Sequence, residues 1–173
     1  MIQVTESLIP DVPWYALYTR SRHEKITDRE LQKRGLETFL PVRKLKRRWS
    51  DRTQIIEEPL FHSYVFVRMP PEERFSVLNT FGAVSLVHFG VKTPAVIPEK
   101  DIETLRRFVQ EEITIDPFPY IKEGQRVYIR SGPFKGVEGF VVRKNQQCRL
   151  VISLDMLMQS VSVEIDSAAI EPA

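Results

Sequence analysis

Basic side chains are the residues of this chain with the clearest chemistry. Residues 20–52 contain twelve Lys or Arg and five Asp or Glu, a local net charge of +7. Residues 111–173 contain seven basic and nine acidic residues, a net charge of −2. Cations at this density neutralise phosphates, so the pattern predicts a polyanion contact in the first half of the chain. The alternative is a charged helix and hairpin that simply face solvent.

Catalytic and metal chemistry find little support in the sequence. His23, His62 and His88 lack metal-ligand spacing, Cys148 has no base near it in sequence, and no phosphate-cradling glycine loop occurs. We therefore expect a binding protein that is not an enzyme and has no cofactor or metal. A single cysteine fits a reducing cytosol. No signal peptide and no apolar run of ~18 residues is visible, so we expect a cytoplasmic protein without a membrane contact.

The cations fall on two predicted elements, a helix that ends near Gly35 and a hairpin. The helix has few apolar positions, so most of its surface should face solvent or phosphate. The hairpin runs through residues 36–48, turns at 49–52 and returns at 54–56, which places Trp49 near its tip. Cations beside an aromatic ring suit a contact along a nucleic-acid backbone, although a charged edge also discourages aggregation.

Residues 58–69 predict the central strand of the fold. Pro59 can open a strand, and alternation places Tyr64 and Phe66 on the same face. Both faces are apolar near the end of the strand, so both should be covered, one of them by a partner protein. On this interpretation Phe66→Ala costs little stability. Burial of the strand within its own domain is the alternative.

The remaining periodicities predict two domains. Strand, helix and hairpin signals in the order β-α-β-β-α-β-α indicate a small α+β sandwich over residues 1–112, with residues 1–12 disordered. Two prolines without periodicity predict a linker at 113–121. Short alternating strands with glycine turns predict a small barrel over 122–173, with no helical alternative form.

Three motifs, in this order, resemble those of NusG-type transcription elongation factors. They are Trp-Tyr-x-x-Tyr at 14–18, Pro-Leu-Phe-x-x-Tyr-Val-Phe-Val at 59–67, and the glycine-punctuated KOW motif from Gly124 to Val141, with Gly-Pro-Phe inside it. The resemblance implies an NGN-type α/β sandwich, an antiparallel sheet flanked by helices, followed by an SH3-like KOW β-barrel.

In function, the resemblance implies a monomeric bacterial elongation and antitermination factor. Its N-terminal domain would bind the clamp helices of RNA polymerase and suppress pausing and termination. Residues 17–25 resemble the specialised RfaH-like and especially UpxY-like paralogs of surface-polysaccharide operons. A general NusG-type factor and a KOW-type ribosomal or RNA-binding protein are the alternatives. The implied polymerase-binding residues are Tyr18, Phe61, Tyr64, Phe66, Ile102 and Leu105.

The resemblance also implies nucleic-acid and barrel partners. The first helix of RfaH-like proteins reads the non-template DNA strand; nascent RNA is the other candidate. The residues expected to contact nucleic acid are Arg20, Arg22, His23, Lys25, Arg29, Lys33, Lys46, Arg47 and Arg48. Glu30 and the lack of a His-Thr-Thr run after Pro71 depart from the RfaH pattern. The barrel would bind Rho or a small ribosomal-subunit protein through Phe134, Met156 and Leu157.

Overall fold

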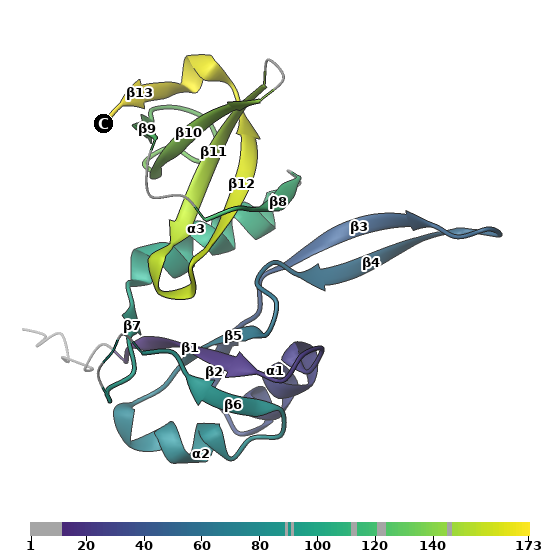
Figure 1. Ribbon diagram of the computed structural model, residues 1–173, viewed down its shortest axis with the longest axis vertical. Helices are drawn as coiled ribbons and strands as arrows, with labels where there is room; N and C mark the ends of the chain where they lie inside the picture. Colours follow the sequence, from purple (N-terminus) through teal and green to yellow (C-terminus); the bar gives the residue numbers. More distant parts are fainter. Residues whose placement is uncertain (1–11, 89, 91, 112–113, 121–123, 145–146) are drawn as a thin grey trace, which may run out of the picture.

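The computed structural model describes residues 12–173 apart from 89, 91, 112–113, 121–123 and 145–146. The disorder predicted for residues 1–12 therefore falls almost wholly outside the described residues. The chain forms a sandwich of helices on a sheet and a second unit made mainly of strands, and a long two-stranded ribbon projects from the first (Figure 1). No helix in the described residues is long and apolar enough to cross a membrane.

An antiparallel sheet forms the centre of the first unit. Its strands, in order across the sheet, are β2 (Glu37–Phe39), β5 (Tyr64–Arg68), β1 (Trp14–Thr19) and β6 (Ala83–Leu86), with β7 (Val96–Ile97) also paired to β1. Ala16 of β1 lies opposite Phe66 of β5. The two central strands are rich in β-branched and aromatic residues, which suit a pleated surface. The predicted sandwich is confirmed, but the predicted central strand over residues 58–69 is only partly right: Pro59 ends β4 of a separate ribbon, and the central strand begins at Tyr64.

Two helices cover one face of this sheet. They are α1 (Glu24–Lys33) and α2 (Arg74–Leu78), the latter preceded by the short η1 (Pro71–Glu73). Leu31 of α1 and Val77 of α2 are fully buried against the face that carries Leu17 and Val65. Gly35 follows α1 at a φ of +83°, where a side chain would be strained, and the chain turns there into β2.

The ribbon consists of β3 (Val42–Arg48) and β4 (Thr53–Pro59), which pair with each other and with no further strand among the described residues. Leu60 donates to the carbonyl of Pro41 at 2.8 Å and closes the base of the ribbon. Trp49 donates to the carbonyl of Arg52 at 2.8 Å and closes its tip. The predicted hairpin with Trp49 near its end is therefore observed.

The C-terminal unit is a single six-stranded antiparallel sheet. Its strands, in order, are β13 (Ile170–Pro172), β9 (Gln125–Ile129), β10 (Glu138–Lys144), β11 (Gln147–Leu154), β12 (Gln159–Ile165) and β8 (Ile115–Phe118), with η2 (Asp155–Leu157) and η3 (Ser167–Ala169) between strands. A Cβ on Gly139 would lie 2.7 Å from the carbonyl oxygen of Val151, so only glycine permits this close strand approach. The arrangement matches the predicted KOW barrel. The predicted linker, however, contains β8, which pairs with β12.

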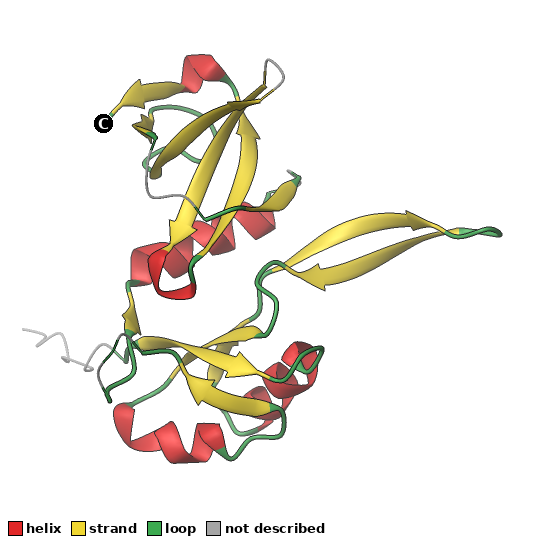
Figure 2. Cartoon of the chain, in the orientation of Figure 1, coloured by secondary structure: helices red, strands yellow, loops and turns green. Residues whose placement is uncertain are grey.

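The remaining helix, α3 (Glu99–Gln110), lies between the sheet and the barrel (Figure 2). Its three fully buried apolar residues, Ile102, Leu105 and Phe108, belong to one apolar cluster that also contains Trp14 of the sheet and Val127 of the barrel. The two units therefore share a continuous core through α3.

Candidate functional site

The residues predicted to bind a polymerase lie together, but most of them are covered. Phe66, Ile102 and Leu105 are fully buried, so the prediction that these three lie in an exposed apolar patch is wrong, and Phe61, also expected to bind the polymerase, is 1% exposed. Tyr18 is 41% exposed. Its ring centroid lies 5.4 Å from that of the half-buried Tyr64. The accessible part of the patch is thus this tyrosine pair, at the end of β1 and the start of β5.

Neighbouring rings and α3 explain the burial of Phe66. The Phe66 ring stacks on Phe39 at 6.0 Å between centroids and meets the edge of Phe61 at 5.8 Å. Arg106 of α3 lies over Phe39, with its guanidinium carbon 5.5 Å from the ring centroid, and over Trp14 at 5.2 Å. The face of β5 that we expected a partner protein to cover is therefore covered by residues of its own domain.

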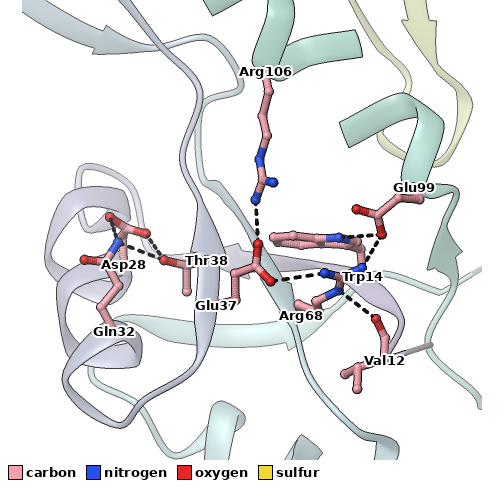
Figure 3. A network of polar contacts seen from close by, with 9 residues as sticks. All are labelled: Val12, Trp14, Asp28, Gln32, Glu37, Thr38, Arg68, Glu99 and Arg106. Atoms are coloured by element: carbon pink, nitrogen blue, oxygen red, sulfur yellow. Dashed lines mark hydrogen bonds and ion pairs between the residues drawn. The ribbon is translucent and has the colours of Figure 1, made fainter. Parts of the chain in front are cut away.

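A polar network holds α3 against the sheet (Figure 3). Glu99 accepts from the indole Nε1 of Trp14 at 3.0 Å and from Arg68. Glu37 accepts from Arg106 at 2.8 Å and from Arg68 at 3.2 Å. The hydrogen bond from Arg106, followed by that from Arg68, lowers the pKa of Glu37. A carboxylate shared by two arginines therefore joins β2, β5 and α3.

We expect Glu37 to make the stability of the chain depend on acid pH. Its folded pKa is lowered, so its stabilising effect is complete above its ordinary pKa of 4.5 and is lost as the pH falls through the folded value. Half-exposed pairs are screened by water, so the effect should be less than about 1 kcal/mol. The melting temperatures of wild type and Glu37→Gln should differ most at pH 6–7, and the difference should shrink as the pH is lowered below 4.5. A difference that does not depend on pH would assign the effect to something other than ionisation.

The barrel covers the outer side of α3. The rings of Phe108 and Phe134 meet edge to face with centroids 4.5 Å apart. Arg107 donates to the carbonyls of Pro133 and Lys135, the latter at 3.1 Å. Burial raises the pKa of Asp101 on the same helix, with a smaller contribution from Asp155 of the barrel. The turn that carries Phe134 is therefore docked on α3.

A second contact joins the barrel to the base of the ribbon. Asp116 of β8 accepts from Arg43 of β3 at 3.1 Å and from Arg149 of β11 at 3.3 Å. Arg43 also donates to Glu58 of β4 at 2.8 Å. The two arginines and two carboxylates are each between 21% and 32% exposed at the side chain. These four side chains are therefore partly buried, and each of them is paired with a side chain of opposite charge.

Two of the three residues predicted as the partner surface of the barrel are not free. Phe134 is 3% exposed and Leu157 is 5% exposed, and both belong to the shared core. The side chain of Met156 lies outside the described part of the chain. Met158, which the sequence did not single out, is 61% exposed at a φ of +51°. The predicted barrel surface is thus occupied by α3 in this arrangement.

The cations predicted to contact nucleic acid form two groups. Arg20, Arg22, His23, Lys25, Arg29 and Lys33 lie on α1 and the loop before it, whereas Lys46, Arg47 and Arg48 lie on β3. Two members of the first group are engaged: Lys33 pairs with Glu30 at 2.7 Å, and Lys25 with Glu57 at 3.6 Å. Arg20, Arg22 and Arg29 are exposed, and no ion-pair partner is present for them within the described ranges.

An aromatic residue beside α1 was missed by the sequence analysis. Phe81 is 59% exposed, and its ring centroid lies 5.5 Å from that of His23. The loop is held because Thr27 donates to the Phe81 carbonyl at 3.0 Å and Gly82 packs on Thr27. The sequence did contain one signal for this exposed ring: Phe81 directly precedes a glycine and does not fit the apolar periodicity of a strand or helix. The loop places one exposed ring among the unpaired cations.

The chain combines a helix-covered sheet with a C-terminal six-stranded sheet, and its exposed cations lie on and beside α1 and on the ribbon. Residues 12–106 match the family model "Transcription termination factor nusG". Transcription termination/antitermination protein NusG of Streptococcus pyogenes serotype M1 is 30% identical over 159 residues, covering 83% of this chain and 88% of the relative. The protein of that name from Staphylococcus aureus (strain N315) is 27% identical over 173 residues, covering 91% and 94%. The chain belongs to the NusG family of transcription termination and antitermination factors.

A solved structure agrees with the fold. The structure described as "Domain interaction in Thermotoga maritima NusG" aligns with a TM-score of 0.55 at 21% identity, covering 92% of this chain and 96% of that one. The similarity supports the shared architecture of the two units.

Proposed function

We propose that this chain is a cytoplasmic elongation and antitermination factor that binds the clamp helices of bacterial RNA polymerase through its N-terminal domain. Family membership supports the class of function. The tyrosine pair, Tyr18 and Tyr64, is the observation that supports this polymerase-binding surface. It leaves aromatic area accessible at the end of a sheet face that is otherwise covered. Burial raises the pKa of the Tyr64 hydroxyl above its ordinary value, so this side chain is neutral at physiological pH.

Polymerase binding to the full predicted surface requires the barrel to leave α3. Ile102 and Leu105 are fully buried in the core that the two units share. We infer that the docked arrangement offers the tyrosine pair first, and Ile102 and Leu105 of α3 only after the domains separate, whereas Phe61 and Phe66 stay packed within their own unit. Separation would also free Phe134 for Rho or a small ribosomal-subunit protein.

The experiment is a polymerase pull-down with Tyr18→Ala/Tyr64→Ala in the full-length chain. Aromatic residues at an interface centre contribute about 2 kcal/mol or more, so we expect affinity to fall at least about thirtyfold. Tyr128→Ala, which removes a tyrosine 37% exposed on the barrel, is the matched control and should bind normally. A double variant that is folded and retains wild-type affinity would refute the assignment.

The unpaired cations around α1 support a contact with the non-template DNA strand or nascent RNA. Arg20, Arg22 and Arg29 are exposed and can meet phosphates, and Phe81 beside His23 offers a ring for base stacking. We propose recruitment at specific operons, in line with the similarity of residues 17–25 to UpxY-like paralogs. A general elongation factor is the second candidate, favoured by the names of the curated relatives. Genome-wide occupancy of this protein would distinguish the two candidates: a specialised factor should occupy one operon, and a general factor all transcribed genes.

A further inference from the structure

The β3–β4 ribbon projects away from both units and its outer half makes no contact with them (Figure 1). An isolated two-stranded ribbon is at best marginally stable, so its outer half is held by cross-strand pairs alone. The ion pairs of the ribbon with other elements lie near its base, at Arg43 with Asp116 and at Glu57 with Lys25. The distal half is therefore an exposed arm whose surface is available to a ligand.

The register places the distal charges on both faces of the arm. Lys46 lies opposite Ile55 and Arg48 opposite Thr53, on the same face as Lys44, whereas Arg47 lies opposite Gln54 on the other face. Residues 45–55 contain four basic side chains and one acidic one, Asp51. Within the described ranges, none of Lys46, Arg47 and Arg48 has an ion-pair partner. Cations left unpaired on an extended arm require a polyanion or solvent.

The tip adds an aromatic contact to these charges. Trp49 is 54% exposed, and the guanidinium carbon of Arg52 lies 6.0 Å from its ring centroid. Ile55 is 60% exposed on the face that carries Lys46 and Arg48. Large apolar side chains in these positions are costly to leave in water, which favours a ligand that covers them together with the cations.

We propose that the β3–β4 ribbon is a binding arm for double-stranded DNA that enters the major groove, with Lys46 and Arg48 of its distal half and Lys44, which lies opposite Glu57 nearer the base, along one phosphate strand. A two-stranded ribbon fits the major groove of B-form DNA, about 12 Å wide. Alternate residues of a strand recur every ~7 Å, close to the rise of two nucleotides along one DNA strand. The deep, narrow major groove of A-form RNA does not admit such a ribbon. Single-strand binding uses a groove with several stacking rings, whereas this arm has one.

The test is fluorescence anisotropy of a labelled DNA duplex of about two helical turns titrated with the full-length chain at several salt concentrations. The face variant is Lys44→Ala/Lys46→Ala/Arg48→Ala. Loss of three phosphate contacts should make the slope of log affinity against log salt shallower by about 2.7. We expect binding to weaken at least tenfold. The control, Lys92→Ala/Lys100→Ala/Lys135→Ala, removes the same charge from exposed positions outside the ribbon and should keep the wild-type slope.

Trp49 supplies a second readout that does not depend on the charge variants. Trp14 is 1% exposed, so an added collisional quencher reports almost entirely on Trp49. Bound duplex should protect Trp49 from quenching, and Trp49→Phe should abolish the protected signal. A face variant with wild-type affinity and slope, a control variant weakened as much as the face variant, or tighter binding of duplex RNA of the same sequence would each overturn the proposal. None of these measurements uses polymerase, so failure here leaves the pull-down result independent.

Discussion

Replacing Phe66 with alanine is expected to lower the free energy of unfolding by about 3–5 kcal/mol. The Phe66 ring is fully buried, and two other rings, Phe39 and Phe61, pack against it with centroids 6.0 and 5.8 Å away. Rigid neighbours cannot close the cavity that the substitution leaves, so transfer and cavity contributions add. In a chain of this length the melting temperature should fall on the order of 10 °C, measured by circular dichroism.

Tyr18→Ala is the matched control for that experiment. Tyr18 lies on the same sheet face but is 41% exposed, so its truncation should cost no more than about 1 kcal/mol. The sequence interpretation expected Phe66 to behave like this control, because it assigned the Phe66 face to a partner. Two small and equal shifts in melting temperature would contradict the packing of Phe66.

Local patterns were sufficient for most of the fold. Residues 14–19 and 64–68 alternate and are β-branched or aromatic, Gly35 ends a helix, and Pro98 begins one, so each element could be predicted from its own residues. Strand β8 could not, because Asp116 and Pro117 carry no strand signal. Pro117 is tolerated there because β8 is an edge strand that pairs with β12 alone. Its existence depends on a non-local pairing.

The candidate surface was harder to predict than the fold for a related reason. Ile102, Leu105 and Phe108 recur at helical spacing, and this period predicts an apolar face without indicating what the face meets. A partner protein and a second domain of the same chain both satisfy it. Likewise, Phe134 belongs to a recognisable Gly-Pro-Phe turn, but its contact with Phe108 depends on how the two units dock. A sequence motif therefore does not indicate whether its residues are exposed or buried in the folded chain.

Replacing Phe134 with alanine should separate the barrel from α3. The substitution removes the edge-to-face contact with Phe108 at 4.5 Å and the apolar burial of the ring, together about 2–3 kcal/mol. The separated population should rise about thirtyfold or more. Backbone ¹⁵N relaxation on the full-length chain measures this directly, since docked domains share one rotational correlation time and separated domains have two.

The same substitution should also change the affinity of the chain for polymerase. If only separated molecules offer Ile102 and Leu105, the apparent dissociation constant is the intrinsic value divided by the separated fraction, so Phe134→Ala should bind at least tenfold more tightly. Arg107→Ala, which loses hydrogen bonds to the carbonyls of Pro133 and Lys135 without changing the barrel, should move both measurements in the same direction.

Phe75→Ala is the control, because it removes a phenyl ring that is 62% exposed on α2, away from the barrel. It should leave one correlation time and wild-type affinity. Conversely, a folded Phe134→Ala chain with a single correlation time and unchanged affinity would mean that Phe108 and Phe134 do not hold the domains together. The contact of Asp116 with Arg43 and Arg149 would then have to supply most of the docking free energy, which Asp116→Ala would reveal by the same relaxation measurement.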